Sequence, residues 1–247
     1  MRFPQGSFVR GSVAGLCALL LMSGCATRSI SDSGYPDKSN GYGRPAGVQY
    51  RGELTEFNVL GIQPTAVVTE EAIREALDKR ERMTLAKNSP VMLVQSGALI
   101  PDEAMVTAFS QYYRPIVFSG VPEEGQGKTN YAGHLRLAAA RSGSEKLMVY
   151  WGILESGREN MSTKVVSWVP ILGALVPDEN QHMRIRLKVA LVDVRTGQWE
   201  MFSPEPFKDV DFSSRGSRAT VDQAQVAMLK EKAYRAAVTQ LFYKFSS

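Results

Sequence analysis

The sequence predicts the α/β class: a single mixed β-sheet with helices packed against it, preceded by a signal peptide and a flexible tether. Three observations lead to this prediction. Short apolar runs alternate with amphipathic stretches from residue 69 to 154, alternating strands follow, and a long amphipathic stretch ends the chain. With 44% hydrophobic residues among 247, the chain can bury one substantial core.

Residues 1–24 are expected to be a lipoprotein signal peptide. Arg2 and Arg10 make the start positive, and the apolar run at 12–22 is shorter than the ~20 residues of a membrane-spanning helix. The run ends in "LLMSGC", which resembles the lipobox of bacterial lipoproteins. The resemblance implies that Cys25 becomes the first residue and carries lipid, with acyl chains such as palmitate. The alternative is an ordinary signal peptide cut near Ala26.

The same resemblance implies a location. In Gram-negative lipoproteins, Asp after the lipidated cysteine tends to retain the protein at the inner membrane, but Ala26 stands here. Sorting to the outer membrane is therefore implied, with the domain facing the periplasm. The mature domain is expected to have no disulfide and no thiol nucleophile, because Cys17 leaves with the signal peptide and Cys25 carries lipid. It keeps 27 basic and 25 acidic residues, a net charge of +2, so nucleic acid is not an expected partner.

Residues 25–50 are expected to comprise the lipidated cysteine and a flexible tether, because they are rich in Ser, Gly, Asp, Asn and Pro and poor in large aliphatic residues. At ~5–6 Å × √n, such a coil would hold the domain on the order of 25–30 Å from its anchor. One α/β domain is expected from residue 51 to 247, and it contains no repeat of fixed period.

A helix is expected to begin after Thr69, which can cap it, with Glu70 and Glu71 in its first turn and its end near Ala86. The following elements alternate between apolar runs and helical periodicity. They are a buried strand at 91–94, a helix at 101–112, a buried strand at 116–118, a helix at 130–142 and a central strand at 147–154.

Antiparallel strands are expected next. A strand at 163–169 ends at Pro170, and the clearest alternation of the chain lies at 184–194. A turn at 196–197 leads to a hairpin partner at 199–202. A long helix closes the chain and begins with the capping-box spacing of Thr220 and Gln223. Its expected buried stripe is Val226, Leu229, Ala233, Ala237 and Leu241.

The stretch "PEEGQGKTNY" at 122–131 ends like a phosphate-binding loop, but Pro122 stands where the first glycine is needed and offers no N–H. We expect no nucleotide here and interpret the stretch as a solvated loop. His134 and His182 are not at metal-ligand spacing, and no Gly-x-Ser-x-Gly elbow occurs. No catalytic residue, metal or cofactor is therefore predicted.

Two features are predicted as a possible partner surface. The segment "VPILGALVP" at 169–177 is apolar and bounded by prolines, and the sequence leaves open whether it is buried or an exposed contact patch. Arg184, Arg186 and Lys188 alternate along one strand, either as a solvated face that deters edge pairing or as an anion-binding row. The apolar residues of the surface are Val169, Ile171, Leu172, Leu175 and Val176.

Two segments resemble a known group. "LVDVRTGQW" at 191–199 and "AAARSGSEKLMVYWGILE" at 138–155 resemble segments of CsgG-type and TolB-N-like envelope lipoproteins, which include curli-secretion, flagellar, polysaccharide-export and penicillin-binding-protein-activator lipoproteins. The resemblance implies a non-enzymatic α/β domain at the outer membrane that binds or assembles with other envelope proteins. The long hairpins of the pore-forming members are not evident.

Two hypotheses of function follow. The first is a binding or assembly factor whose partners are the membrane, through Cys25, and other envelope proteins, without nucleotide or nucleic acid. The alternative is a lipid-anchored envelope hydrolase, peptidase-like, with a site assembled from acidic, Ser or His side chains far apart in sequence. Oligomeric state stays open.

Overall fold

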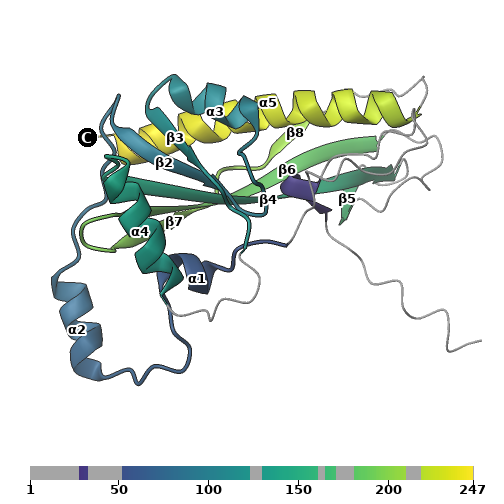
Figure 1. The fold of residues 1–247 in the computed structure, drawn as a ribbon. Helices are drawn as coiled ribbons and strands as arrows, with labels where there is room; N and C mark the ends of the chain where they lie inside the picture. The colour runs from purple at the N-terminus through teal and green to yellow at the C-terminus, as the bar shows by residue number, and fades with distance from the viewer. Residues whose placement is uncertain are drawn as a thin grey trace, which may run out of the picture.

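A computed structural model describes residues 28–32, 52–122, 130–160, 165–170, 181–209 and 218–246 (Figure 1). The helices are α1 (Glu56–Leu60), α2 (Glu70–Asp78), α3 (Glu103–Ser110), α4 (Tyr131–Arg141) and α5 (Arg218–Phe245), with a 3-10 turn η2 (Ile30–Asp32). The strands are β1 (Arg28–Ser29), β2 (Pro90–Gln95), β3 (Arg114–Phe118), β4 (Lys146–Asn160), β5 (Val165–Pro170), β6 (Gln181–Asp193), β7 (Trp199–Phe202) and β8 (Phe207–Asp209).

The eight strands found among the described residues belong to one mixed sheet, which confirms the predicted fold class. Its main order is β3-β2-β4-β6-β7, with β2 parallel to β3 and β4, and β6 antiparallel to β4 and β7. The parallel half comes from the β-α-β-α-β order, in which a helix connects each strand to the next. The antiparallel half is built by strands that follow one another closely along the chain.

The sheet is organised around β4, whose 15 residues make it long enough to hold several partners along one edge. On that edge β2 pairs with residues 146–150, β1 with 153–154 and β5 with 155–160. The other edge pairs with β6 along its length. The sequence predicted the central place of this strand but not its full length.

Helices cover both faces of the sheet (Figure 1). On one face α3 and α5 pack over Leu93 and Leu187 in a core that includes the fully buried Phe109 and Tyr234. On the other face α4 and α1 cover a second core that includes Val94, Val149 and Ala190. The predicted stripe of the last helix is confirmed: all five of its residues are buried. Among the described residues, no helix is both long enough and apolar enough to cross a bilayer.

Three predictions about local structure are wrong in part. The helix after Thr69 ends at Asp78 rather than near Ala86, because Met83 and Leu85 are buried from an extended chain whose Leu85 N–H bonds the carbonyl of Phe245. The strand predicted as buried at 116–118 is an edge strand, with Val117 and Phe118 exposed. Residues 28–32, inside the predicted tether, are docked on the sheet as β1 and η2.

Candidate functional site

Most of the predicted apolar surface lies outside the described residues. Val169 belongs to β5, where its backbone is opposite Ser156 of β4. Ile171, Leu172, Leu175 and Val176 fall in the range 171–180, which the structure does not describe. The glycine-rich residues 123–129 also fall outside it, so the prediction of no nucleotide there stays a prediction.

The predicted cationic row lies on one face of β6 and is ion-paired within the chain. Arg184 donates through Nε to Oε2 of Glu155 at 2.5 Å, and Nη2 of Arg186 lies 3.1 Å from Oε1 of the same carboxylate. The side chains of Arg184 and Glu155 are largely buried, whereas Arg186 is half exposed. Glu155 is opposite Arg184 in the β4–β6 register, so strand pairing brings the acid to its partners.

Lys188 extends the same row to α1. Its ammonium donates to Glu56 and lies 5.8 Å from the ring centroid of Trp151, a cation–π distance. The indole of Trp151 donates to the carbonyl of Leu54 at 2.8 Å, which ties this strand face to the start of α1. Two acids therefore face three cations, and the row is better described as an ion-paired surface than as an open anion site.

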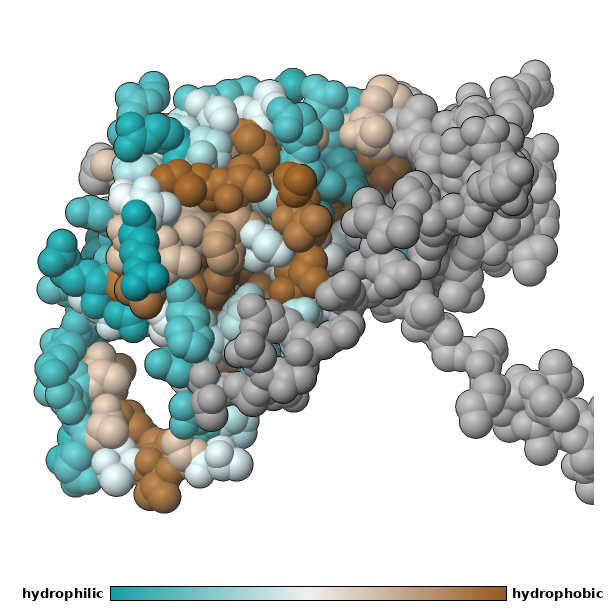
Figure 2. Space-filling view, viewed as in Figure 1, coloured by the Kyte–Doolittle hydropathy of each residue, from teal (hydrophilic) through white to brown (hydrophobic). Residues whose placement is uncertain are grey.

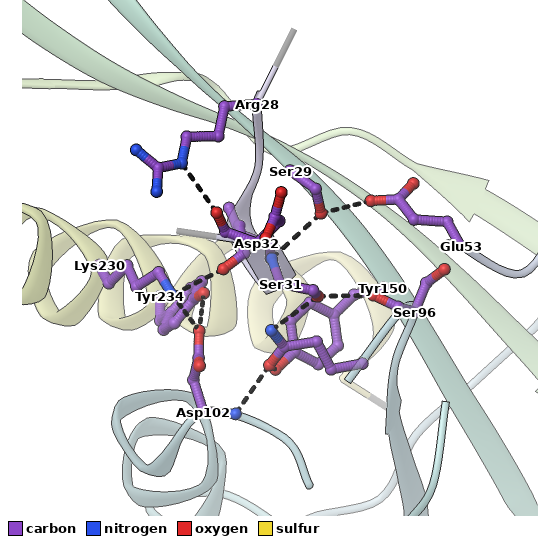
Figure 3. Close-up of polar contacts among 12 residues, drawn as sticks. Arg28, Ser29, Ser31, Asp32, Glu53, Ser96, Asp102, Tyr150, Lys230 and Tyr234 are labelled. Carbon is purple, nitrogen blue, oxygen red and sulfur yellow. Dashed lines mark hydrogen bonds and ion pairs between the residues drawn. The ribbon is translucent and has the colours of Figure 1, made fainter. Parts of the chain in front are cut away.

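A second polar cluster forms where residues 28–32, the docked segment, meet the domain (Figure 3). Arg28 and Ser29 pair with Leu154 and Ile153 of β4. The hydroxyl of Ser29 donates to Glu53 at 2.5 Å and accepts from the N–H of Ser31 at 3.0 Å. The strand pairing of Arg28 and Ser29 and the two hydrogen bonds of the Ser29 hydroxyl thus hold the first part of the segment in place.

The next contacts join the docked segment to the carboxyl end of β2. Ser31 donates to the carbonyl of Ser96 at 2.6 Å, and Nε2 of Gln95 donates back to the Ser31 hydroxyl at 3.0 Å. Gln95 is fully buried, and its Oε1 accepts from the Tyr150 hydroxyl at 2.5 Å and from the N–H of Asp102 at 2.7 Å. A buried amide with this many partners is strongly fixed in position.

Helix α5 supplies the third side of the cluster. Nζ of Lys230 donates to the carbonyl of Ile30 and to Oδ2 of Asp102, both at 2.8 Å. The Tyr234 hydroxyl donates to the same carboxylate oxygen at 2.6 Å. Burial raises the pKa of Tyr234 and of Tyr150 well above 10, so both hydroxyls are protonated donors at neutral pH.

The apolar contact of the docked segment is Ile30, which is 1% exposed and belongs to the core on the α5 face. It lies over Gly152, where a Cβ atom would be 2.9 Å from Cδ1 of Ile30 and 2.7 Å from Cδ2 of Leu187. A glycine in the middle of a strand often marks such a close approach. Gly152 therefore makes room for a side chain from more than 120 residues earlier in the sequence.

The cationic row of β6 and the polar cluster around the docked segment both contain side chains of types used in catalysis. The hydrogen bonds of these side chains described above are to other groups of the same chain. Serine, tyrosine, lysine and carboxylate groups meet around the docked segment, and each bond given above joins two groups of this protein. Among the described residues, no three His, Cys, Asp or Glu side chains are placed to hold a metal ion. His134 is an exposed residue of α4, and the side chain of His182 is not described.

A third feature is an exposed arm formed by residues 61–82, every one of which is exposed. Helix α2 lies within it and stands away from the sheet (Figure 1). Apolar surface lies on this protrusion, as the brown atoms of the arm at the lower left show (Figure 2). The exposed large apolar residues of the arm are Ile62, Val67, Val68, Ile73 and Leu77.

Helix α2 has local support for its structure but no core. Thr69 caps it as predicted, accepting from the N–H of Ala72 at 3.2 Å. Glu71 pairs with Arg74 at 2.8 Å and Glu75 pairs with Lys79. Isolated helices of 9 residues are marginal in water, and this one leaves its apolar face to solvent. The sequence predicted the helix but not that its stripe lacks a partner within the described chain.

A match to a family model defines the class of this protein, that of bacterial lipoproteins anchored to a membrane of the envelope through lipid. The chain belongs to the YafT bacterial lipoprotein family, whose family model matches residues 55–244. No curated protein matches the chain. It is similar to a PelC dodecamer structure from Paraburkholderia phytofirmans at 12% identity, covering 64% of this chain and 95% of that one with a TM-score of 0.26, a value too low to support a conclusion.

Proposed function

We propose that this lipoprotein is a non-enzymatic binding or assembly factor, held at the outer membrane by lipid on Cys25 with its domain in the periplasm. Family membership supports the lipid anchor, and "LLMSGC" supports Cys25 as its position. Ala26 supports the outer membrane as its destination. Residues 1–24 are then the signal peptide, and residues 51–247 form the domain that meets partners.

The observation that carries this proposal is the exposed arm. Its Val67, just before α2, is 93% exposed, and its Leu77 is 65% exposed on a helix that is capped and ion-paired but buries none of its own residues. An amphipathic helix with an exposed apolar stripe is a common peptide-recognition element, since the stripe can enter an apolar groove of another protein. We infer that the arm contacts a protein of the envelope.

The surface at 169–177 with Arg184, Arg186 and Lys188 remains part of the proposal as a second contact. The ion pairs with Glu155 and Glu56 make its charged part close to balanced, so it fits the mixed polar margin of a protein interface better than a site for a free anion. The similarity of residues 138–155 and 191–199 to CsgG-type lipoproteins supports the same class of function.

The hydrolase hypothesis is the weaker one on the described geometry. A hydrolase needs a nucleophile or water beside a base in a place that substrate can enter. The richest polar cluster is instead filled by the docked segment, whose Ser29 and Ser31 hydroxyls are bonded to Glu53 and to the Ser96 carbonyl. We therefore favour binding over catalysis.

Site-specific photocrosslinking in living cells tests the proposal. A photoreactive residue at Leu77 of the arm should give adducts with an envelope protein, identified by mass spectrometry. The same residue at Leu137 of α4, which is 48% exposed, is the matched control and should not. Ile73→Asp should abolish the Leu77 adducts. Equal adducts from both positions, or adducts that survive Ile73→Asp, would contradict a contact through the arm.

A further inference from the structure

The docked segment begins only three residues after Cys25. Successive residues of an extended chain advance by at most ~3.6 Å, so Cys25 lies within roughly 10 Å of Arg28. A free tether from Cys25 to Gly52 would instead have a mean span on the order of 30 Å. Docking at residues 28–32 therefore shortens the distance between the domain and a lipid anchor at Cys25 about three-fold.

The docking place is built by the domain rather than by chance contact at its surface. Three separate parts of the chain converge on the segment. The carboxyl end of β2 contacts it through Ser96 and α5 contacts it through Lys230 (Figure 3), and the middle of β4 contacts it at Gly152. Ile30 is buried in the main core, and Gly152 leaves the volume that it fills. The segment thus completes the fold on this side of the sheet.

We propose that the docked segment holds the folded domain close to the lipid surface, and we call it the latch for this reason. The partner of this side of the domain is the membrane that carries the lipid. The proposal rests on lipid attachment at Cys25, which belongs to the proposed function. It goes beyond that function by fixing how far the domain stands from its membrane.

The latch also fixes which part of the domain is near the membrane. β1 lies on the β4 edge between β2 and β5, so that edge of the sheet is closest to the anchor. In Figure 1 the exposed arm projects at the lower left, whereas the docked segment lies near the middle of the ribbon beside β4 and β6. Held in this way, the domain keeps its arm available to a protein partner.

Neutron reflectometry measures the spacing directly. The mature chain from Cys25 has a single cysteine, so a maleimide phospholipid can be attached there chemically. On a supported bilayer of phosphatidylethanolamine and phosphatidylglycerol, the domain should begin within about 10 Å of the headgroups. Ile30→Asp should release the segment and widen the gap about three-fold. Ile62→Asp, the same change at an exposed position, should leave the gap unchanged.

Chemical attachment of the lipid separates the claim that cells lipidate Cys25 from the claim that the docked segment holds the domain near the membrane. If cells do not lipidate Cys25, the mass of the mature protein will show it, and the reflectometry result stands unaffected. Should Ile30→Asp prevent folding, the double variant Ser29→Ala/Ser31→Ala removes the hydroxyl bonds without placing a charge in the core and should widen the gap. A wide gap in the unaltered protein, or no widening in a folded released variant, would overturn the latch.

Discussion

Ile30 packs directly over Gly152: a Cβ atom on the glycine would lie 2.9 Å from Cδ1 of the isoleucine. Contacts under 3.0 Å are essentially never made by real Cβ atoms, so any larger residue at position 152 would force Ile30 and Leu187 to move. This contact joins the docked segment to the central strand of the sheet.

Gly152→Val should therefore lower the free energy of unfolding by about 1–3 kcal/mol, the usual cost of overfilling a core. Denaturant unfolding measures it. Ile30→Ala removes the clash with Ile30 and leaves only the clash with Leu187, so the double variant should lose less than the sum of the two single losses. If the losses of unfolding free energy in the two single variants simply add in the double variant, Gly152 is not needed to accommodate the side chain of Ile30.

Asp102 joins two residues of α5, accepting from Lys230 at 2.8 Å and from Tyr234 at 2.6 Å. Asp102→Ala should cost about 2–3 kcal/mol of stability, because it leaves a largely buried ammonium without its carboxylate. Tyr234→Phe, which removes one hydroxyl bond, should cost about 1 kcal/mol. Thermal unfolding of Asp102→Ala/Lys230→Met should recover part of the first loss, and no recovery would argue against the pair.

The pH dependence of stability should report on Asp193 at the β6–β7 turn. Its burial raises the pKa, but hydrogen bonds from Lys146 and Thr196 outweigh this and lower it from 3.8 to about 2. A carboxylate with a lowered pKa in the folded state stabilises above its unfolded pKa, and that contribution is lost as pH falls from about 4 to 2. Asp193→Asn should flatten this part of an acid unfolding curve. An unchanged curve would contradict the assignment.

The exposed arm should tolerate a charge. Leu77→Asp is expected to change stability by less than about 0.5 kcal/mol, because the side chain is already 65% exposed. If the proposed contact with an envelope protein is correct, the same variant should weaken capture of that protein by roughly 30-fold, as expected for an anchor worth ~2 kcal/mol. Leu137→Asp on α4 is the control that should alter neither quantity. A large loss of stability in Leu77→Asp would mean that the arm packs on its own chain.

Much of the fold follows from local patterns. The short apolar runs at β2 and β4 and the 3.6-residue stripe of α5 are set by burial on one or both faces, so periodicity alone finds them. The cap at Thr69 and the turn at Thr196 are likewise local chemistry: Thr69 accepts from Ala72, and Asp193 accepts from Thr196. Such features were predictable residue by residue.

The docked segment was not predictable in that way. Its single large apolar residue, Ile30, stands among small polar residues, which by composition resemble a flexible linker. What orders it comes from elsewhere in the sequence: the space over Gly152 and the ammonium of Lys230. The glycine inside an otherwise apolar strand was the available signal, since such a glycine often marks a close approach.

The acidic partners of the cationic row, Glu155 and Glu56, were also not predicted, because their contacts depend on distant parts of the sequence. Glu155 meets Arg184 only through the register of β4 with β6, and Glu56 reaches Lys188 from a short helix that local periodicity does not reveal. Register between strands is set by the whole sheet rather than by either strand alone.

Hydrogen exchange tests most directly the central claim that residues 28–32, the docked segment, are part of the fold. We predict that the backbone amides of Ser29, Ile30 and Ser31 exchange slowly, with protection comparable to that of Ile153 and Leu154, their neighbours in β4. In Ile30→Asp this protection should be lost while that of β4 persists. Exchange of the three amides at the rate of an unfolded chain in the unaltered protein would contradict the account.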